Sequence, residues 1–151
     1  MKVAIGSDHA GFDLKQQVVA YVAELGHEPL DVGTYTPDRV DYPVYGALVG
    51  EAVVAGDADL GIVVCGSGIG ISIAANKVPG VRAGACSEPY SARMARRHNN
   101  ANVIGFGGRV IGVDVMKMIV DEWLTTEFET GGRHEHRVDL ITSLDERREL
   151  R

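Results

Sequence analysis

The sequence predicts a doubly wound α/β fold, in which a five-stranded parallel sheet lies between two layers of helices. Five short apolar runs rich in β-branched residues recur along the chain, as expected for strands buried on both faces. Segments with apolar residues at helical spacing alternate with these runs, which is typical of parallel sheets. The 151 residues, 45% of them hydrophobic, suit one globular domain spanning 1–151.

The first apolar run, residues 3–5, is followed by a helical stripe from Leu14 to Leu25 that ends at Gly26. Four further strands are expected, at residues 30–32, 60–65, 81–86 and 103–106. Four crossover or covering helices are expected, at residues 44–55, 69–76, 88–98 and 113–124. This order of elements indicates a Rossmann-like, three-layer arrangement.

A charged tail follows, in which Val138, Ile141 and Leu144 recur at helical spacing. These residues predict an additional C-terminal helix at about 133–148. Its narrow apolar stripe leaves two interpretations open, because the helix can lie on the surface of its own chain or pack on a partner subunit.

The charge of the chain restricts its partners. With 15 basic and 21 acidic residues, the net charge is −6, so the chain should repel nucleic acid and anionic membranes. An anionic ligand must therefore be held by a local basic cluster. No run of 18 apolar residues occurs, and two cysteines are too few for a disulfide scaffold. We therefore expect a cytoplasmic protein.

Polar side chains follow the predicted strands at the point where each strand ends. Asp8 and His9 follow the first strand, Tyr42 follows the second, Cys65 ends the third and Arg109 follows the fifth. Ligands of open parallel sheets bind beyond the carboxyl ends of the strands. These residues are therefore expected at one edge of the sheet.

The turn after Cys65 contains three glycines, Gly66, Gly68 and Gly70, and opens the third predicted helix. Glycines let backbone N–H groups converge on an oxyanion, either a phosphate or an enediolate oxygen. The alternative is a turn that glycines merely tighten. The spacing is G-x-G-x-G, which differs from the dinucleotide-binding G-x-G-x-x-G.

Each candidate side chain also has an ordinary structural interpretation. Cys65 precedes a helix, where N–H groups favour a thiolate, whereas Cys86 is interpreted as an inert core thiol. His98, near the end of a predicted helix, is either an acid–base group or a partly exposed residue that helps to end the helix. Asp8 can simply cap the following helix, and His9 can simply be exposed.

Arg133 and Arg137 are four residues apart. On a helix that begins near Gly132 they would share a face and could grip one phosphate together. A solvated face paired with Glu135 and Asp139 explains the same spacing equally well.

Six motifs, taken together, carry a resemblance that covers about 130 residues. They are GSDHAGF at 6–12, VDYP at 40–43, CGSGIGISIAANK at 65–77, CSEPYSA at 86–92, RRHNNANV at 96–103 and GGRHEHRV at 131–138. The chain resembles the type B ribose-5-phosphate isomerases and the related galactose-6-phosphate isomerase subunits. The resemblance implies an aldose–ketose isomerase without metal or cofactor, a homodimer or homotetramer whose active sites are shared between subunits.

The resemblance also implies roles for individual residues. Cys65 would be the base that moves a proton between C2 and C1, and Ser67, which replaces a common threonine, would stabilise the enediolate with the 66–70 loop. His98 would open the sugar ring. The remaining positions would bind substrate, with Asp8, Tyr42 and Asn99 on sugar hydroxyls and His9, Arg109, Arg133 and Arg137 on the phosphate. Some members use a glutamate in this loop, but residues 69–72 offer no carboxylate.

The favoured substrate is ribose 5-phosphate, interconverted with ribulose 5-phosphate. A hexose 6-phosphate of the allose or galactose type is an alternative, because pockets discriminate poorly between sugars that differ by one carbon. A non-enzymatic nucleotide-binding module is another. A metal enzyme that uses His9, His98, His134 and His136 has no supporting motif such as H-E-x-x-H.

Overall fold

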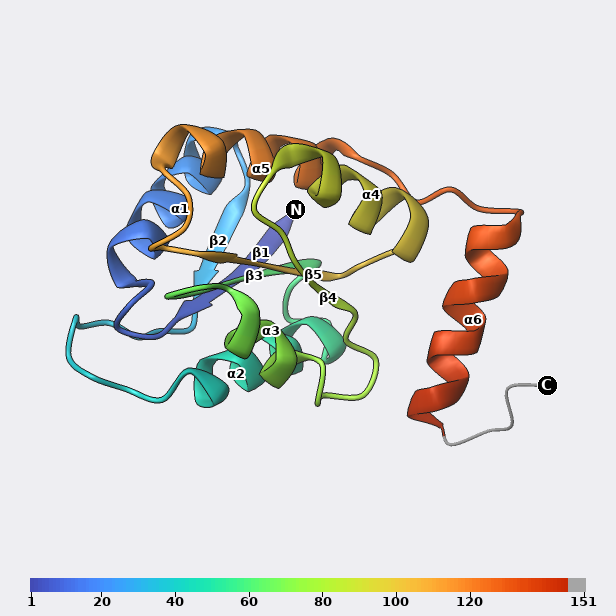
Figure 1. Cartoon of the computed structure of the whole chain (residues 1–151), viewed down its shortest axis with the longest axis horizontal. Coiled ribbons are helices and arrows are strands. Elements are labelled where there is room, and N and C mark those ends of the chain that lie inside the picture. The colour runs from blue at the N-terminus through green and yellow to red at the C-terminus, as the bar shows by residue number, and fades with distance from the viewer. Residues whose placement is uncertain (147–151) are drawn as a thin grey trace.

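The computed structural model describes residues 1–146, and a five-stranded sheet lies at its centre with helices on both faces (Figure 1). The strands are β1 (Lys2–Ser7), β2 (Glu28–Asp31), β3 (Leu60–Cys65), β4 (Ala83–Ala85) and β5 (Val103–Gly107). The helices are α1 (Phe12–Glu24), α2 (Tyr42–Val54), α3 (Ile69–Ala75), α4 (Pro89–Asn99), α5 (Val113–Thr125) and α6 (Arg133–Asp145). The predicted fold class is confirmed.

All strand pairs are parallel, and the strand order is β2-β1-β3-β5-β4. From β1 the chain continues to β2, toward one edge of the sheet. From β3 it continues to β4 and β5, toward the other edge. The order therefore reverses between β1 and β3. At such a reversal the connections diverge and leave a crevice at the carboxyl ends of the two strands.

The fourth strand is shorter than the predicted run 81–86. Before Ala83, the side chain of Asn102 accepts a hydrogen bond from the Arg82 N–H at 2.8 Å. At Ala83 itself, the side chain of Asn76 binds both backbone groups, at 2.7 and 2.9 Å. The Arg82 N–H is thus bonded to a side chain, and β4 pairs with β5 only from Ala83 to Ala85, at the edge of the sheet.

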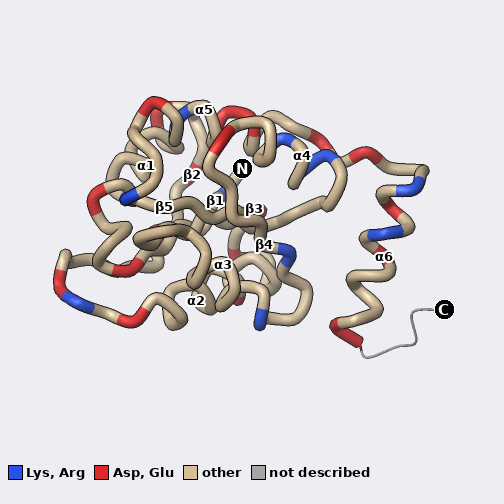
Figure 2. The backbone as a smooth tube through the Cα atoms, in the orientation of Figure 1, with Lys and Arg blue, Asp and Glu red and all other residues tan. Residues whose placement is uncertain are grey.

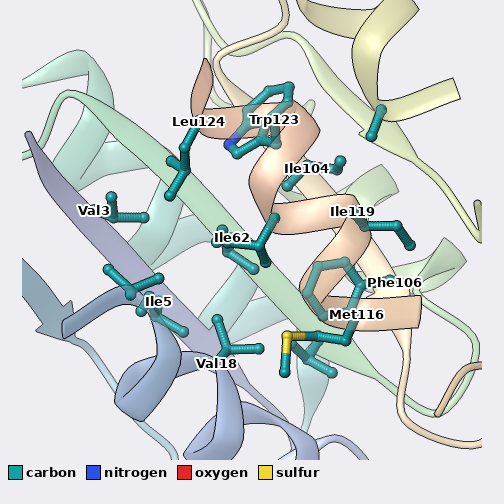
Figure 3. Packing of buried hydrophobic residues seen from close by; sticks show 14 of the residues in the cluster. Val3, Ile5, Val18, Ile62, Ile104, Phe106, Met116, Ile119, Trp123 and Leu124 are labelled. Atoms are coloured by element: carbon teal, nitrogen blue, oxygen red, sulfur yellow. The ribbon is translucent and has the colours of Figure 1, made fainter. Parts of the chain in front are cut away.

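Side chains of the central strands alternate between two cores. The larger core lies under α1, α4 and α5, and Figure 3 shows α5 packing onto the strands. Its labelled members include Ile62, Ile104, Phe106, Met116, Ile119 and Trp123. The smaller core contains Ala4, Val63 and Val103 from the strands and lies under α2 and α3. Burial on both faces explains why the strands read as nearly continuous apolar runs.

Helix α6 stands beyond α4, away from the sheet (Figure 1). Its buried residues are His134 and Val138, and Asp145 accepts a hydrogen bond from the Gly80 N–H at 2.8 Å. The helix ends at Asp145, whereas residues 147 and 148 of the predicted helix lie outside the described residues. Within residues 1–146, no helix is long and apolar enough to cross a membrane.

Candidate active site

A pocket of about 460 Å³ opens at the carboxyl edge of the sheet, where the strand order reverses. The loops after β1, β3 and β5 and the start of α2 form its walls. Its lining residues are Asp8, His9, Ala10, Tyr42, Cys65, Gly66, Ser67, Gly70 and Arg109. All except Ala10 are predicted site residues. They lie together because the carboxyl ends of parallel strands meet at one edge of the sheet. We call these eight residues the pocket group.

The wall after β3 is built around Cys65 and Gly68. The Gly68 N–H donates a hydrogen bond to the Cys65 Sγ at 3.1 Å. Gly68 has a φ of +80°, and a Cβ there would lie 2.6 Å from the Phe106 backbone. Only glycine fits such a position, since the conformation is left-handed and a rigid strand blocks the side chain. The glycine therefore holds a donor against the sulfur atom.

Ser67 and Tyr42 complete this side of the pocket. The Ser67 hydroxyl accepts a hydrogen bond from the Ile69 N–H at 3.3 Å. The Tyr42 ring packs against Gly70, where a Cβ would lie 2.9 Å from the ring carbons. The first residue of α2 thus lies against the first turn of α3.

Asp8 and His9 come from the loop after β1. One carboxylate oxygen of Asp8, Oδ1, accepts hydrogen bonds from the N–H groups of Ala10 and Gly11, at 2.9 and 3.0 Å. The other oxygen has no hydrogen-bond partner within residues 1–146. The Nδ1 atom of His9 lies 3.2 Å from the carbonyl oxygen and 3.3 Å from the nitrogen of Val40. Because Val40 holds Nδ1, the Nε2 atom of His9 is left for a ligand.

Arg109 is fixed through its backbone. Its N–H donates to the Gly66 carbonyl at 3.2 Å, and the preceding Gly108 N–H donates to the Cys65 carbonyl at 2.8 Å. The turn after β5 is thereby tied to the loop after β3. The guanidinium forms no ion pair with any carboxylate in the described part of the chain. Arg109 therefore presents an uncompensated positive charge to an anionic ligand.

Four predicted site residues lie elsewhere: His98, Asn99, Arg133 and Arg137, which we call the α4–α6 group. Asn99 lines a second cavity of about 290 Å³ together with Arg82 and Ile141. Arg133 and Arg137 occupy the first two turns of α6, where Figure 2 shows its basic residues. In one chain, the pocket group and the α4–α6 group do not line the same cavity.

In the α4–α6 group, His98 contacts His134, a contact that the sequence does not predict. Its ring stacks on that of His134, with centroids 3.9 Å apart and planes 3° from parallel. Burial lowers the pKa of His134, and the nearby His98 and Arg133 lower it further. The Arg133 Nε donates to the His134 Nε2 at 3.3 Å, which requires a neutral ring at that nitrogen. The ring that stacks on His98 is therefore the neutral imidazole of His134.

The histidines considered as metal ligands are not gathered together. His9 lines the pocket, whereas His98 and His134 stack between α4 and α6. Among the residues that the structure describes, no three His, Cys, Asp or Glu side chains form a cluster that could hold a metal ion.

Known proteins resemble this chain over nearly its whole length. Ribose-5-phosphate isomerase B of Escherichia coli is 53% identical over 147 residues, which are 97% of this chain and 98% of that protein. The solved structure of Clostridium thermocellum ribose-5-phosphate isomerase B superimposes with a TM-score of 0.95, at 50% identity, over 97% of this chain and 99% of that one.

A third relative has been solved with a sugar phosphate. The structure of Mycoplasma genitalium ribose-5-phosphate isomerase B with bound ribulose-5-phosphate has a TM-score of 0.91 to this chain, at 37% identity, and 96% of each chain is covered. The ribose/galactose isomerase family profile matches residues 3–141. Sequence, fold and profile agree over the same residues, and the chain therefore belongs to the ribose/galactose isomerase family.

Proposed function

We propose that this protein interconverts D-ribose 5-phosphate and D-ribulose 5-phosphate, with Cys65 as the base. One observation carries the proposal: the Cys65 sulfur lies in the pocket wall, accepts an N–H from Gly68, and shares the pocket with the unpaired Arg109. An N–H donor stabilises negative charge on sulfur, and an unpaired arginine attracts a phosphate. The names of the relatives above support the choice of substrate.

The reaction begins with the cyclic sugar. His98 transfers a proton to the ring oxygen as the bond between C1 and the ring oxygen breaks, and the proton of the C1 hydroxyl passes to water, which produces the aldehyde. The Cys65 thiolate then removes the proton from C2, and the electron pair forms the C1–C2 double bond of an enediolate with its charge on O1. Ser67 and the N–H groups of the 66–70 loop stabilise this oxygen.

The second half returns the protons. The Cys65 thiol gives its proton to C1 while the proton on O2 passes to O1, so C2 becomes the ketone carbon, the C1 hydroxyl forms and the thiolate is regenerated. Asp8, Tyr42 and Asn99 hold sugar hydroxyls in this scheme. His9, Arg109, Arg133 and Arg137 bind the phosphate, which orients a small substrate by remote binding energy.

The scheme needs both groups of residues at one substrate, although one chain keeps them apart. We therefore propose a homodimer, or a tetramer built from such dimers, in which α4 and α6 of one subunit complete the pocket of the other. Exposed apolar side chains on the outer faces of α2, α3 and α6 support this arrangement, since such surfaces mark subunit contacts. They are Val44, Leu48, Ile69, Ile73, Ile141 and Leu144.

The two thiols also bear on location. Cys65 and Cys86 are both free, and free thiols are typical of the reducing cytoplasm. Cytoplasmic location is part of the proposal.

The test is an assay of ribose 5-phosphate isomerisation with three variants of the protein. Cys65→Ala should reduce kcat at least about a hundredfold, because a general base contributes that much or more. Cys86→Ala is the matched control and should retain kcat, because burial and the nearby Glu88 raise the pKa of the Cys86 thiol to about 11. Wild-type activity in Cys65→Ala would exclude this base.

His98→Ala separates ring opening from proton transfer. The variant should lose activity on the cyclic substrate and retain it on a sugar phosphate that cannot cyclise. Allose 6-phosphate and galactose 6-phosphate are assayed in parallel, and a higher kcat/KM for either would replace ribose 5-phosphate as the substrate. Inactivity of the wild-type protein on every sugar phosphate would refute the isomerase proposal and favour a binding module.

A further inference from the structure

The first turn of α1 carries a lysine that is completely buried. The Lys15 side chain has no exposed surface, although lysine is rarely buried without a specific partner. Its Nζ donates to both carboxylate oxygens of Asp31, at 2.7 and 2.6 Å, and to the Thr34 carbonyl at 2.8 Å. All three protons of the ammonium group therefore have acceptors. None of these three hydrogen bonds joins Lys15 to a residue of the pocket group.

These acceptors belong to the start of one loop. The connection from β2 to α2, residues 32–41, is the long excursion at the lower left of Figure 1. Asp31 also accepts the Gly33 N–H at 2.9 Å, while Gly33 and Thr34 exchange backbone hydrogen bonds with Ser7, at 2.7 and 2.9 Å. Lys15 thus fastens the loop beside the end of β1, directly before Asp8.

The other end of the loop reaches the substrate pocket. Val40 holds the Nδ1 atom of His9, and Tyr42 begins α2 two residues later. Residues 35–39, between the two ends, are exposed. In this middle part, Thr36 donates to Asp38 at 3.0 Å within the loop, and the Tyr35 hydroxyl donates back to the Asp31 carbonyl at 3.1 Å. The loop is therefore anchored beside Lys15 at one end and at His9 and Tyr42 at the other.

We propose that Lys15 is a positioning residue for the substrate pocket, which acts by fixing loop 32–41 so that Val40 orients His9 and α2 presents Tyr42. The Cys65 sulfur and its Gly68 donor belong to β3 and the loop after it, and their hydrogen bond involves no residue of loop 32–41. Loss of Lys15 should consequently weaken substrate binding more than the chemical step. Of the experiments that test this inference, only the kinetic ones rest on the proposed function.

The kinetic experiment compares Lys15→Met with Val18→Ala. Met has a similar length, and Asp31 is about a quarter exposed, so water can solvate the freed carboxylate in the folded protein. Lys15→Met should raise KM for ribose 5-phosphate about tenfold with kcat within about twofold of wild type. Val18→Ala, a fully buried change on the same helix, should lower Tm without changing KM. An unchanged KM in Lys15→Met would overturn the proposal.

A double-mutant cycle identifies the route. If Lys15 acts through His9, then His9→Ala should raise KM less in the Lys15→Met background than in wild type, because the histidine is already misplaced. Ser67→Ala, whose hydroxyl bonds the Ile69 N–H and no residue of loop 32–41, should have the same effect in both backgrounds. Additive effects of Lys15→Met and His9→Ala would exclude the route through loop 32–41.

A readout without catalysis distinguishes failure of this inference from failure of the proposed function. Nitrogen NMR of the His9 ring, assigned with His9→Ala, should report a shifted Nδ1 signal in Lys15→Met and an unchanged one in Val18→Ala. If Lys15→Met does not fold, Asp31→Asn replaces it, since the amide keeps the shape and one acceptor. An unchanged Nδ1 signal in the folded variant contradicts the positioning role, whether or not the wild-type protein isomerises sugars.

Discussion

At the scale of single residues, the pocket depends on how closely backbone segments approach one another. Gly68 lies against the backbone of β5 at Phe106, and this contact places its N–H on the sulfur of Cys65. The turn that carries Arg109 is tied to Cys65 and Gly66 by the N–H groups of Gly108 and Arg109. Main-chain contacts consequently hold the sulfur, its donor and the backbone of Arg109.

We predict that Gly68→Ala destabilises the protein and lowers kcat at least tenfold. The matched control is Gly26→Ala, because both glycines have nearly the same φ, +80° and +81°, but a Cβ at Gly26 meets nothing within 4 Å. The control should lose about 1 kcal/mol of unfolding free energy from left-handed strain alone. Gly68→Ala should lose more, because its Cβ would lie 2.6 Å from the Phe106 backbone. Urea unfolding and kcat measure both effects, and equal losses would contradict the packing argument.

At the scale of elements, the helices over the larger core are tied to one another as well as to the sheet. The Tyr21 hydroxyl of α1 donates to the Asp121 carboxylate of α5 at 2.7 Å. This hydrogen bond, together with burial and the charge of Asp121, raises the pKa of Tyr21 to about 12. Helix α1 also carries Lys15, so the same element packs on α5 and fastens loop 32–41.

The stabilisation from Tyr21 should depend on pH. Because the pKa of the folded state is raised above the ordinary value of 10, the contribution is complete below pH 10 and is lost as the pH rises toward 12. Tyr21→Phe should therefore be about 1 kcal/mol less stable than wild type at pH 8, with a smaller difference at pH 11.5. Tyr90→Phe is the control, since the exposed Tyr90 has no hydroxyl partner among the described residues. A difference that does not change with pH would contradict the assignment.

At the scale of the whole molecule, one chain separates residues that the proposed reaction needs together. The pocket group lies where the strand order reverses, whereas the α4–α6 group lies at the end of α4 and the start of α6, the helix that stands beyond α4 (Figure 1). In the proposed dimer, the basic residues of α6 reach the ligand in the pocket of the other chain. The second subunit is part of the proposed mechanism for this reason.

Hybrid dimers test the shared site. Cys65→Ala and His98→Ala homodimers should each be inactive, because every site lacks one group. Equal amounts of the two chains, unfolded and refolded together, should form hybrids in half of the dimers, and each hybrid has one intact site. The mixture should recover about a quarter of the wild-type specific activity. No recovery in proven hybrids would place both residues at the same subunit's site.

Much of the fold follows from local patterns in the sequence. A short apolar run such as 60–65 predicts a strand, and apolar residues at helical spacing, as from Leu14 to Leu25, predict a helix. The spacing is informative because the residues that face the core must be apolar. The pocket group is predictable for a related reason: residues that follow parallel strands must meet at one edge of the sheet. The position of β5 between β3 and β4 is not predictable, because local pattern contains no information on which strands pair.

The sequence by itself determined the alternation of elements, the family resemblance and the residues at the carboxyl edge. Only the tertiary structure decided that Lys15 is buried and that His134 stacks on His98. It also separated Arg133 and Arg137 from the pocket. Burial of a charge and stacking of two rings depend on partners 16 or more residues away, which no local spacing reveals. Periodicity records which face of an element is buried, whereas contacts between elements exist only once the chain has folded.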